Sequence, residues 1–230
     1  MFIGHFGLAF AAKRAAPRVS LGTAFLAAQW LDLLWPTLLL LGMETVRIAP
    51  GATAVTPLVF DHYPISHSLT AGMCWALALG AVYALAKHNV RGAVVVGALV
   101  VSHWLLDAIV HVPDLPLAPG MDTMVGLGLW QSRAATLAVE IPVFAIGAWL
   151  YATSTQAKDS SGRWGLVGLL AFLALIHAGN LSGEPPPSVT AIAWVGQAQW
   201  LLVAWGYWVD AHRTARGPLT GGPAAMPPRP

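Results

Sequence analysis

The chain has 230 residues, of which 57% are hydrophobic and only 10% are charged, and its mean hydropathy is +0.64. A soluble domain usually carries about 25% charged residues, so this composition excludes an ordinary soluble enzyme and places the chain in a lipid bilayer. The formal net charge of +2 gives no indication of a nucleic-acid partner, and the single cysteine, Cys74, excludes an intramolecular disulfide.

The first apolar segment, Met1–Ala12, is about 18 Å long as a helix, too short to cross a hydrocarbon core of about 30 Å. We therefore expect a half-membrane helix that turns back near Pro17. Longer apolar segments, each of spanning length, then follow in chain order: Leu21–Gly42, His67–Lys87, Gly92–His111, Ala134–Ala152, Trp164–Leu181 and Ala191–Val209.

These segments predict an all-α fold, a polytopic membrane protein with about six transmembrane helices plus the short N-terminal half-membrane helix. Residues 1–212 form one helical domain in this scheme, and the Pro- and Gly-rich residues 213–230 are expected to be a disordered cytoplasmic tail. Ten of the 12 Lys and Arg residues fall on one side of the membrane, and only Arg47 and Arg133 fall on the other. By the positive-inside rule, both termini are cytoplasmic.

The stretch from Ser102 to His111 carries ionisable side chains inside an apolar run. His103, Asp107 and His111 follow one another at intervals of four residues, so on a helix they share one face. Ionisable groups cost a few kcal/mol each in a membrane helix and usually face a cavity or a partner. This spacing is more typical of metal ligands than of packing, although a buried hydrogen-bonded pair between helices remains the alternative.

Other ionisable residues are predicted to reach the same depth in the membrane. His5 and Asp32 lie equally far along the chain from the turn near residue 18, and Glu140 lies mid-helix close to that level. His67 and His111 are expected at the outer rim of this layer. Imidazole and carboxylate groups are ligands of divalent metals, and we expect one or two ions, with zinc favoured, held by a set drawn from seven side chains: His5, Asp32, His67, His103, Asp107, His111 and Glu140.

Three residues are candidates for catalysis rather than binding alone. Asp32 or Glu140 is placed to act as a general base, and His62, in the external loop, as a lid ligand or general acid. A structural role stays open for each, since Glu140 precedes Pro142 in a helix and a loop histidine is often only solvated. Arg133 is a candidate phosphate ligand, with a headgroup contact as the alternative.

The motifs Gly4-His5, Asp32, His62-x4-His67-Ser68-Leu69 and Ser102-His103-x3-Asp107 resemble those of the YdjM/YbcI-like group (DUF457) of bacterial membrane-bound metal-dependent hydrolases. The resemblance covers residues 1–140. The order of polar residues is in turn similar to that of zinc-dependent phospholipase C and S1/P1 nucleases. The resemblance implies a bacterial inner-membrane location and metal ligation by His5, Asp32, His67, His103 and Asp107. The chain departs from the group in having one carboxylate in its first long helix and no arginine after His62.

Three functions are compatible with these features. The first is a metal-dependent hydrolase of a phosphoester or lipid substrate, in which a metal-activated water attacks. The second is a transporter or channel for a proton or metal ion, and the third is a structural or regulatory membrane protein. Membrane lipid is the partner that all three imply, and the oligomeric state is left open.

Overall fold

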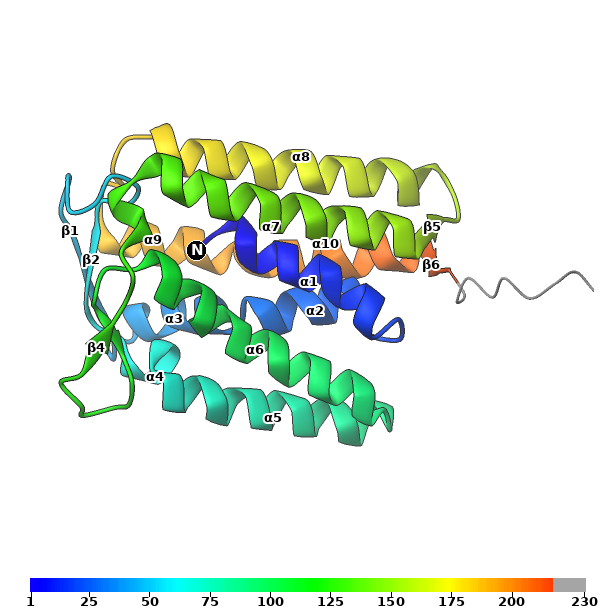
Figure 1. The fold of residues 1–230 in the computed structure, drawn as a ribbon, viewed down its shortest axis with the longest axis horizontal. Coiled ribbons are helices and arrows are strands. Elements are labelled where there is room, and N and C mark those ends of the chain that lie inside the picture. The colour runs from blue at the N-terminus through cyan, green and yellow to red at the C-terminus, as the bar shows by residue number, and fades with distance from the viewer. Residues whose placement is uncertain (217–230) are drawn as a thin grey trace, which may run out of the picture.

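The helices of the protein lie side by side along one direction, with short strands at the two ends (Figure 1). The structure, a computed structural model, describes residues 1–216. The end that carries β1 (Thr45–Ile48) and β2 (Leu58–His62) is called the β1–β2 end. The opposite end carries β5 (Thr155–Ala157) and β6 (Arg213–Ala215) and is called the β5–β6 end.

Long apolar helices make up most of the fold. Within residues 1–216, four helices are long and apolar enough to cross a membrane: α5 (Leu69–Lys87), α6 (Val90–Val110), α7 (Arg133–Ser154) and α8 (Ser160–Ser182). Their outward faces remain apolar, as the exposed side chains of Leu77 and Leu85 on α5 illustrate. A soluble monomer rarely exposes so continuous an apolar surface, so these helices are compatible with a membrane protein.

The first predicted span, Leu21–Gly42, is a broken helix. It consists of α2 (Leu21–Ala28) and α3 (Trp30–Leu40), which meet at Gln29 at an angle of 55°. Together the two pieces pass the same test of length and composition, so the described residues contain four helices of spanning length, or five if the bent pair counts as one.

The last predicted span, Ala191–Val209, is also divided. The structure has α9 (Val189–Gln197) and α10 (Gln199–Ala211), which meet at Ala198. The apolar pattern therefore predicted helices at all six positions, but it did not predict the breaks at Gln29 and Ala198. A count of six spans stays a prediction.

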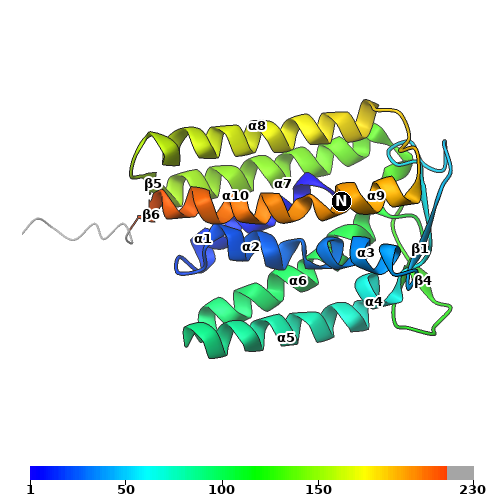
Figure 2. The same ribbon diagram turned by 180° about the vertical axis from the view of Figure 1, so that it is seen from behind.

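The N-terminal helix α1 (Ile3–Ala15) begins inside the bundle and runs toward the β5–β6 end (Figures 1 and 2). It packs against α7 at a very close approach. A Cβ atom on Gly147 would overlap the Gly7 carbonyl oxygen, so the two backbones meet where neither helix has a side chain. This contact fixes the N-terminal end of α1 beside the middle of the bundle.

Aromatic side chains fill the bundle between its two ends. Phe6 and Phe10 of α1 are fully buried and meet the ring of Phe25 edge-on, at centroid distances of 4.9 and 5.1 Å. Tyr151 of α7 lies on the far side of Phe10, at 5.5 Å. This packing separates the polar residues near the start of α1 from those near its end.

Short antiparallel strand pairs lie at the ends of the bundle, and the sequence did not predict them. β1 pairs with β2, β3 (Leu115–Pro116) pairs with β4 (Met124–Val125), and β5 pairs with β6. The remaining short elements are α4 (Pro64–His67) and the 3₁₀ turn η1 (Leu129–Gln131). Because residues 213–215 form β6, ordered structure continues past the predicted boundary at residue 212. The rest of the predicted tail, residues 217–230, lies outside the described residues.

Candidate metal centre

Four helices bring imidazole and carboxylate groups together inside the bundle. The five residues are His5 on α1, Asp32 in the first turn of α3, His67 at the end of α4, and His103 and Asp107 on α6. All except Asp32 are buried. We call these five residues the His/Asp centre.

Local sequence explains why these side chains converge. His103 and Asp107 are four residues apart, so both point from the same face of α6. The break at Gln29 turns α3 away from α2 and brings Asp32 to the start of a new helix. His67 ends the short helix α4, and Ser68 caps α5 by accepting a hydrogen bond from the Ala71 N–H, so His67 is held at the corner between two helices.

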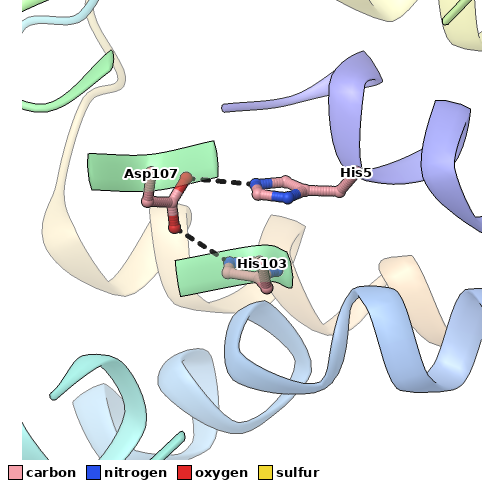
Figure 3. Close-up of side chains that lie close together, drawn as sticks. All are labelled: His5, His103 and Asp107. Carbon is pink, nitrogen blue, oxygen red and sulfur yellow. Dashed lines mark hydrogen bonds and ion pairs between the residues drawn. The ribbon is translucent and has the colours of Figure 1, made fainter. Parts of the chain in front are cut away.

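Asp107 is the middle of the centre. Its Oδ1 lies 3.1 Å from His5 Nε2, and its Oδ2 lies 3.0 Å from His103 Nε2 and 3.8 Å from His67 Nε2. Figure 3 shows the carboxylate beside the edges of both rings, with one oxygen toward His5 of α1 and the other toward His103 of α6. The His5 and His103 rings are stacked with their centroids 3.7 Å apart, and the Met1 amine nitrogen also contacts Asp107 Oδ1.

Asp32 closes the other side of the centre. Its Oδ1 lies 3.4 Å from His67 Nε2 and 3.7 Å from His103 Nε2. Its side chain is 27% exposed, whereas the side chains of His67, His103 and Asp107 are at most 5% exposed. Asp32 is therefore the member of the centre that faces open space.

Hydrogen bonds on the far side of the His103 ring determine what its Nε2 can do. Nδ1 lies 2.6 Å from the carbonyl oxygen of Ala28, and a carbonyl only accepts, so Nδ1 carries the proton and donates it. The Ala28 carbonyl is in the last turn of α2, where helix carbonyls lack partners within the helix. Nε2 of a neutral His103 is then an acceptor that no N–H or O–H donor reaches, and its neighbour at 3.0 Å, Asp107 Oδ2, is also an acceptor.

The same logic applies to His67. The Ser66 hydroxyl donates its only proton to Glu44 Oε2 at 2.6 Å, so His67 Nδ1, 2.7 Å from Ser66 Oγ, must be the donor in that contact. His67 Nε2 therefore also presents a lone pair to the centre. Two imidazole nitrogens and two carboxylate oxygens thus face one another, all of them acceptors.

The described side chains contain groups of donors that could hold a divalent metal ion. A proton on one imidazole nitrogen would pair that nitrogen with one carboxylate oxygen. One metal ion, in contrast, can bind several of these acceptor atoms at once. A tetrahedral zinc ion with bonds of about 2.0–2.2 Å holds its donor atoms roughly 3.3–3.6 Å apart. Four of the six donor pairs formed by His67, His103, Asp32 and Asp107 are separated by 3.0, 3.4, 3.7 and 3.8 Å. Two overlapping groups of three residues, His5–His103–Asp107 and Asp32–His67–His103, could each hold a metal ion.

The structure does not bring Glu140 into either group. Its Oε2 accepts hydrogen bonds from the backbone N–H groups of Phe2, at 3.0 Å, and Gly4, at 3.4 Å. These N–H groups lie at the N-terminal end of α1, where a helix has free donors and a partial positive charge. The buried carboxylate of Glu140 thus holds α1 against α7.

His111 lies outside both groups as well. Its Nδ1 is 2.9 Å from Asp114 Oδ1, and the Tyr63 hydroxyl donates to the same oxygen at 3.1 Å. Burial, and then the neighbouring Asp114 carboxylate, raise the pKa of Tyr63, so its hydroxyl stays protonated and can donate. The ring of Trp130 packs 4.1 Å from the His111 ring.

His62 lies at the end of β2, with its side chain exposed, opposite Thr45 of β1. The β1–β2 pairing holds this residue in a hairpin on the surface and not over the centre. The sequence-based assignment of His62 as a lid ligand or general acid therefore has no support from its position.

A cavity of about 950 Å³ connects the centre with the surface. Asp32, His67 and Asp107 line its inner end, and His111, Glu140 and Arg133 also border it. Much of the remaining wall is apolar, from Trp35, Phe60 and Trp130 near the β1–β2 end and from Phe172, Ile176, Val195, Leu201, Leu202 and Trp205 on α8, α9 and α10. Residues 50–58 and Pro185–Pro187 border its outer part.

Sequence analysis missed the residues that orient the histidines. Glu44 and Ser66 had no motif to mark them, although Ser66 stands next to His67 in Ser66-His67-Ser68. The Ala28 carbonyl was not detectable, since only the break at Gln29 makes it available to His103.

Comparisons of the chain with models of known protein families, with curated proteins and with solved structures find no match. The family resemblance therefore stays a prediction that rests on the motifs alone.

Proposed function

We propose that this chain is a metal-dependent hydrolase embedded in a membrane, acting on a phosphoester or lipid substrate, with zinc as the favoured ion. The observation that carries the proposal is the meeting of acceptor atoms from His67, His103, Asp32 and Asp107, with four of their six pairwise separations between 3.0 and 3.8 Å. Buried acceptors that face one another without a proton between them repel, and a cation in their midst removes that cost.

A catalytic zinc ion keeps one of its four positions open for water, so we assign it three buried ligands, His67, His103 and Asp107, and leave the position beside Asp32 to water. A divalent ion held there would supply Lewis-acid activation of a water molecule and of a substrate oxygen. His67, His103 and Asp107 are buried and would hold the ion from the protein side. Asp32 faces the cavity. We therefore assign it the role of general base, which accepts a proton from the attacking water. Glu140 is assigned to hold α1, and His62 receives no role.

The cavity supports an amphiphilic substrate. Its inner end is polar and carries the His/Asp centre, whereas the wall from α8, α9 and α10 is apolar. Ile176, Val195 and Leu201 line the cavity and are also 37%, 74% and 71% exposed, so this wall continues onto the outer apolar surface of the bundle. A lipid chain can occupy such a wall while its ester group reaches Asp32.

Arg133 gives the cavity a positive charge. Its Nε donates to the Ala54 carbonyl at 2.7 Å, and its side chain lies at the cavity lining near the β1–β2 end. The planar guanidinium retains further N–H donors that match phosphate geometry. This residue supports a phosphoester over a neutral ester.

We place the chain in a bacterial inner membrane, with six spans, a half-membrane α1 and both termini cytoplasmic. Support comes from the four helices of spanning length and from the excess of Lys and Arg expected on the cytoplasmic side. In this orientation the cavity opens toward the outer face.

A transporter is the alternative, and the packing of α1 weighs against it. Between His5 and Lys13, the buried rings of Phe6 and Phe10 pack against Phe25. An ion path to both faces needs polar groups along its length, so a site that is closed on one side favours a hydrolase.

The first test is elemental analysis of the detergent-purified protein. We expect about one equivalent of zinc per chain, absent from the His103→Ala/Asp107→Ala variant, because both removed groups are donors. His177→Ala is the matched control, since His177 is a buried histidine that borders the same cavity but belongs to neither donor group, and it should keep its metal.

Circular dichroism and size-exclusion chromatography check that each variant folds. Wild-type protein without metal after purification and after dialysis against zinc would refute the proposal, and so would equal metal content in the folded double variant. If metal binds as expected, phosphoester lipids in mixed micelles are the substrates to assay. Asp32→Asn should then lose turnover. Metal-dependent ion flux in proteoliposomes without hydrolysis would favour the transporter.

A further inference from the structure

A chain of hydrogen bonds runs from the buried carboxylate of Glu44 to the His/Asp centre. Glu44 Oε2 accepts from the Ser66 hydroxyl at 2.6 Å, and Ser66 Oγ accepts from His67 Nδ1 at 2.7 Å. The other nitrogen of the ring, Nε2, lies 3.4 Å from Asp32 Oδ1. Glu44, Ser66 and His67 are 1%, 0% and 4% exposed.

Glu44 is held so that it cannot turn away. Its Oε1 accepts hydrogen bonds from the backbone N–H groups of Ile65 and Ser66, both at 2.8 Å, while Oε2 is left for the Ser66 hydroxyl. A buried carboxylate is costly unless hydrogen bonds satisfy it, and this one has three. The donors all come from the segment that carries His67, so the position of Glu44 and the position of the ring are linked.

The two histidines of the four-donor set are oriented by different means. His103 Nδ1 donates to the backbone carbonyl of Ala28, whereas His67 Nδ1 donates to a side chain that is itself bound to a carboxylate. Partners of this kind on the far nitrogen fix the tautomer and the ring plane of a metal-binding histidine and raise its basicity. Only the His67 partner can be removed by mutation.

We propose that Glu44 and Ser66 are positioning residues that hold His67 as a metal ligand through Nε2. This inference rests on the proposed function, because it gives His67 a metal to bind. The competing explanation is structural, since Glu44 also accepts from two backbone N–H groups and could serve only to fix the short helix α4. Stability and metal affinity separate the two explanations.

The test uses Ser66→Ala in the full-length protein, purified in detergent. Zinc affinity is measured by competition with a chelator, and the absorption spectrum of the cobalt-loaded protein reports on the ligands. We expect Ser66→Ala to bind zinc 10- to 100-fold more weakly and to shift the cobalt spectrum, because Nδ1 loses its acceptor and the proton can move to Nε2. Ser66→Thr keeps a hydroxyl and should restore the affinity to within about threefold.

Ser68→Ala is the matched control. Ser68 is a buried serine two residues further on, and it caps α5 and donates to the Pro64 carbonyl without a hydrogen bond to His67. This variant should lower the melting temperature of the metal-free protein but leave zinc affinity and the cobalt spectrum unchanged. Glu44→Gln serves as the second variant, since an amide nitrogen at the Oε2 position cannot accept from Ser66 and should weaken zinc binding by a similar factor.

The outcomes distinguish this inference from the proposed function. If wild-type protein binds no metal, both fail. If wild-type protein binds zinc and the folded Ser66→Ala and Glu44→Gln variants bind it with equal affinity and an unchanged cobalt spectrum, the inference is refuted and the proposed function stands. If Ser66→Ala does not fold, Glu44→Gln carries the same test.

Discussion

Two polar clusters lie at different levels of the same bundle, and they differ in how well their atoms are paired. Toward the β5–β6 end, Lys13 donates to Asp210 Oδ2 and to the Val19 carbonyl, and Tyr151 donates to Asp210 Oδ1. Both carboxylate oxygens of Asp210 therefore have a donor, and the ammonium group has two acceptors. We call Lys13, Tyr151 and Asp210 the lysine cluster.

The His/Asp centre, by contrast, contains polar atoms without partners. His5 Nδ1 and His103 Nε2 are buried and make no hydrogen bond. Fully paired polar groups tie helices together, as the lysine cluster ties α1, α7 and α10. Buried groups left unpaired in a native fold are often places where a ligand or ion completes the bonding. In this molecule the lysine cluster is fully paired, whereas the His/Asp centre contains buried nitrogens that no donor reaches.

Lys13→Met breaks the paired cluster and should give the largest effect on stability. The side chains of Lys13 and Asp210 are 8% and 13% exposed. Removal of Lys13 therefore leaves the Asp210 carboxylate buried without its cation. We expect the free energy of unfolding to fall by about 3 kcal/mol, measured by denaturant titration in detergent. Zinc affinity should not change, because the aromatic packing around Phe10 separates the clusters.

The double variant Lys13→Met/Asp210→Leu is the control for this prediction. It removes both charges, so most of the lost stability should return. If Lys13→Met instead weakened zinc binding as strongly as it weakened the fold, the two clusters would be one coupled unit and the contrast between them would be wrong.

His5→Phe tests the comparison at the His/Asp centre. His5 Nε2 lies 3.1 Å from Asp107 Oδ1, and we infer that His5 acts through Asp107 and is not itself a ligand in the four-donor set. Phenylalanine keeps the stacking on His103 and removes the unpaired Nδ1. We expect about a tenfold loss of zinc affinity, which corresponds to about 1.4 kcal/mol, in a chelator competition.

His177→Phe is the matched substitution outside the donor groups and should leave zinc affinity unaltered. A loss of 1,000-fold or more in His5→Phe would identify His5 as a direct ligand. The metal content of the wild-type protein should then be two equivalents, with Asp107 shared between the ions.

Much of the fold could be predicted from the sequence because its determinants are local or compositional. The long apolar segments that became α5, α6, α7 and α8 are confirmed as helices of spanning length. The break at Gln29 was not predictable, since no proline or glycine marks it within Ala27-Ala28-Gln29-Trp30. The paired strands have two to five residues each, too few to show a period in the sequence.

The candidate site was predictable only in part, for a similar reason. His103 and Asp107 share one helix, so their spacing indicated a common face. Equal distances from a turn correctly suggested that His5 and Asp32 lie near them. The same reasoning failed to show that Glu140 would meet the free N–H groups of α1, because the depth of a residue says nothing about which helix end it faces. Glu44 and Ser66 act through contacts between segments, which spacing along the chain cannot reveal.

The smallest predicted effect concerns a third, exposed pair at the β5–β6 end. Asp159 caps α8 by accepting from the Gly162 N–H at 2.8 Å, and its other oxygen lies 2.8 Å from His212 Nδ1. The hydrogen bond from His212, followed by the backbone N–H, lowers the pKa of Asp159 below its ordinary value of 3.8. A lowered pKa means that the folded protein favours the carboxylate, so this contribution is present above about pH 4 and is lost as the pH falls through the lowered pKa.

Asp159→Asn should therefore lower the melting temperature by about 2 °C at pH 7, and the difference from wild type should shrink below pH 4. Melting curves of both proteins from pH 7 to pH 3 test this. A difference that stays constant over that range would mean that the ionised form of Asp159 adds nothing, and that full pairing stabilises this protein only where the paired groups are buried.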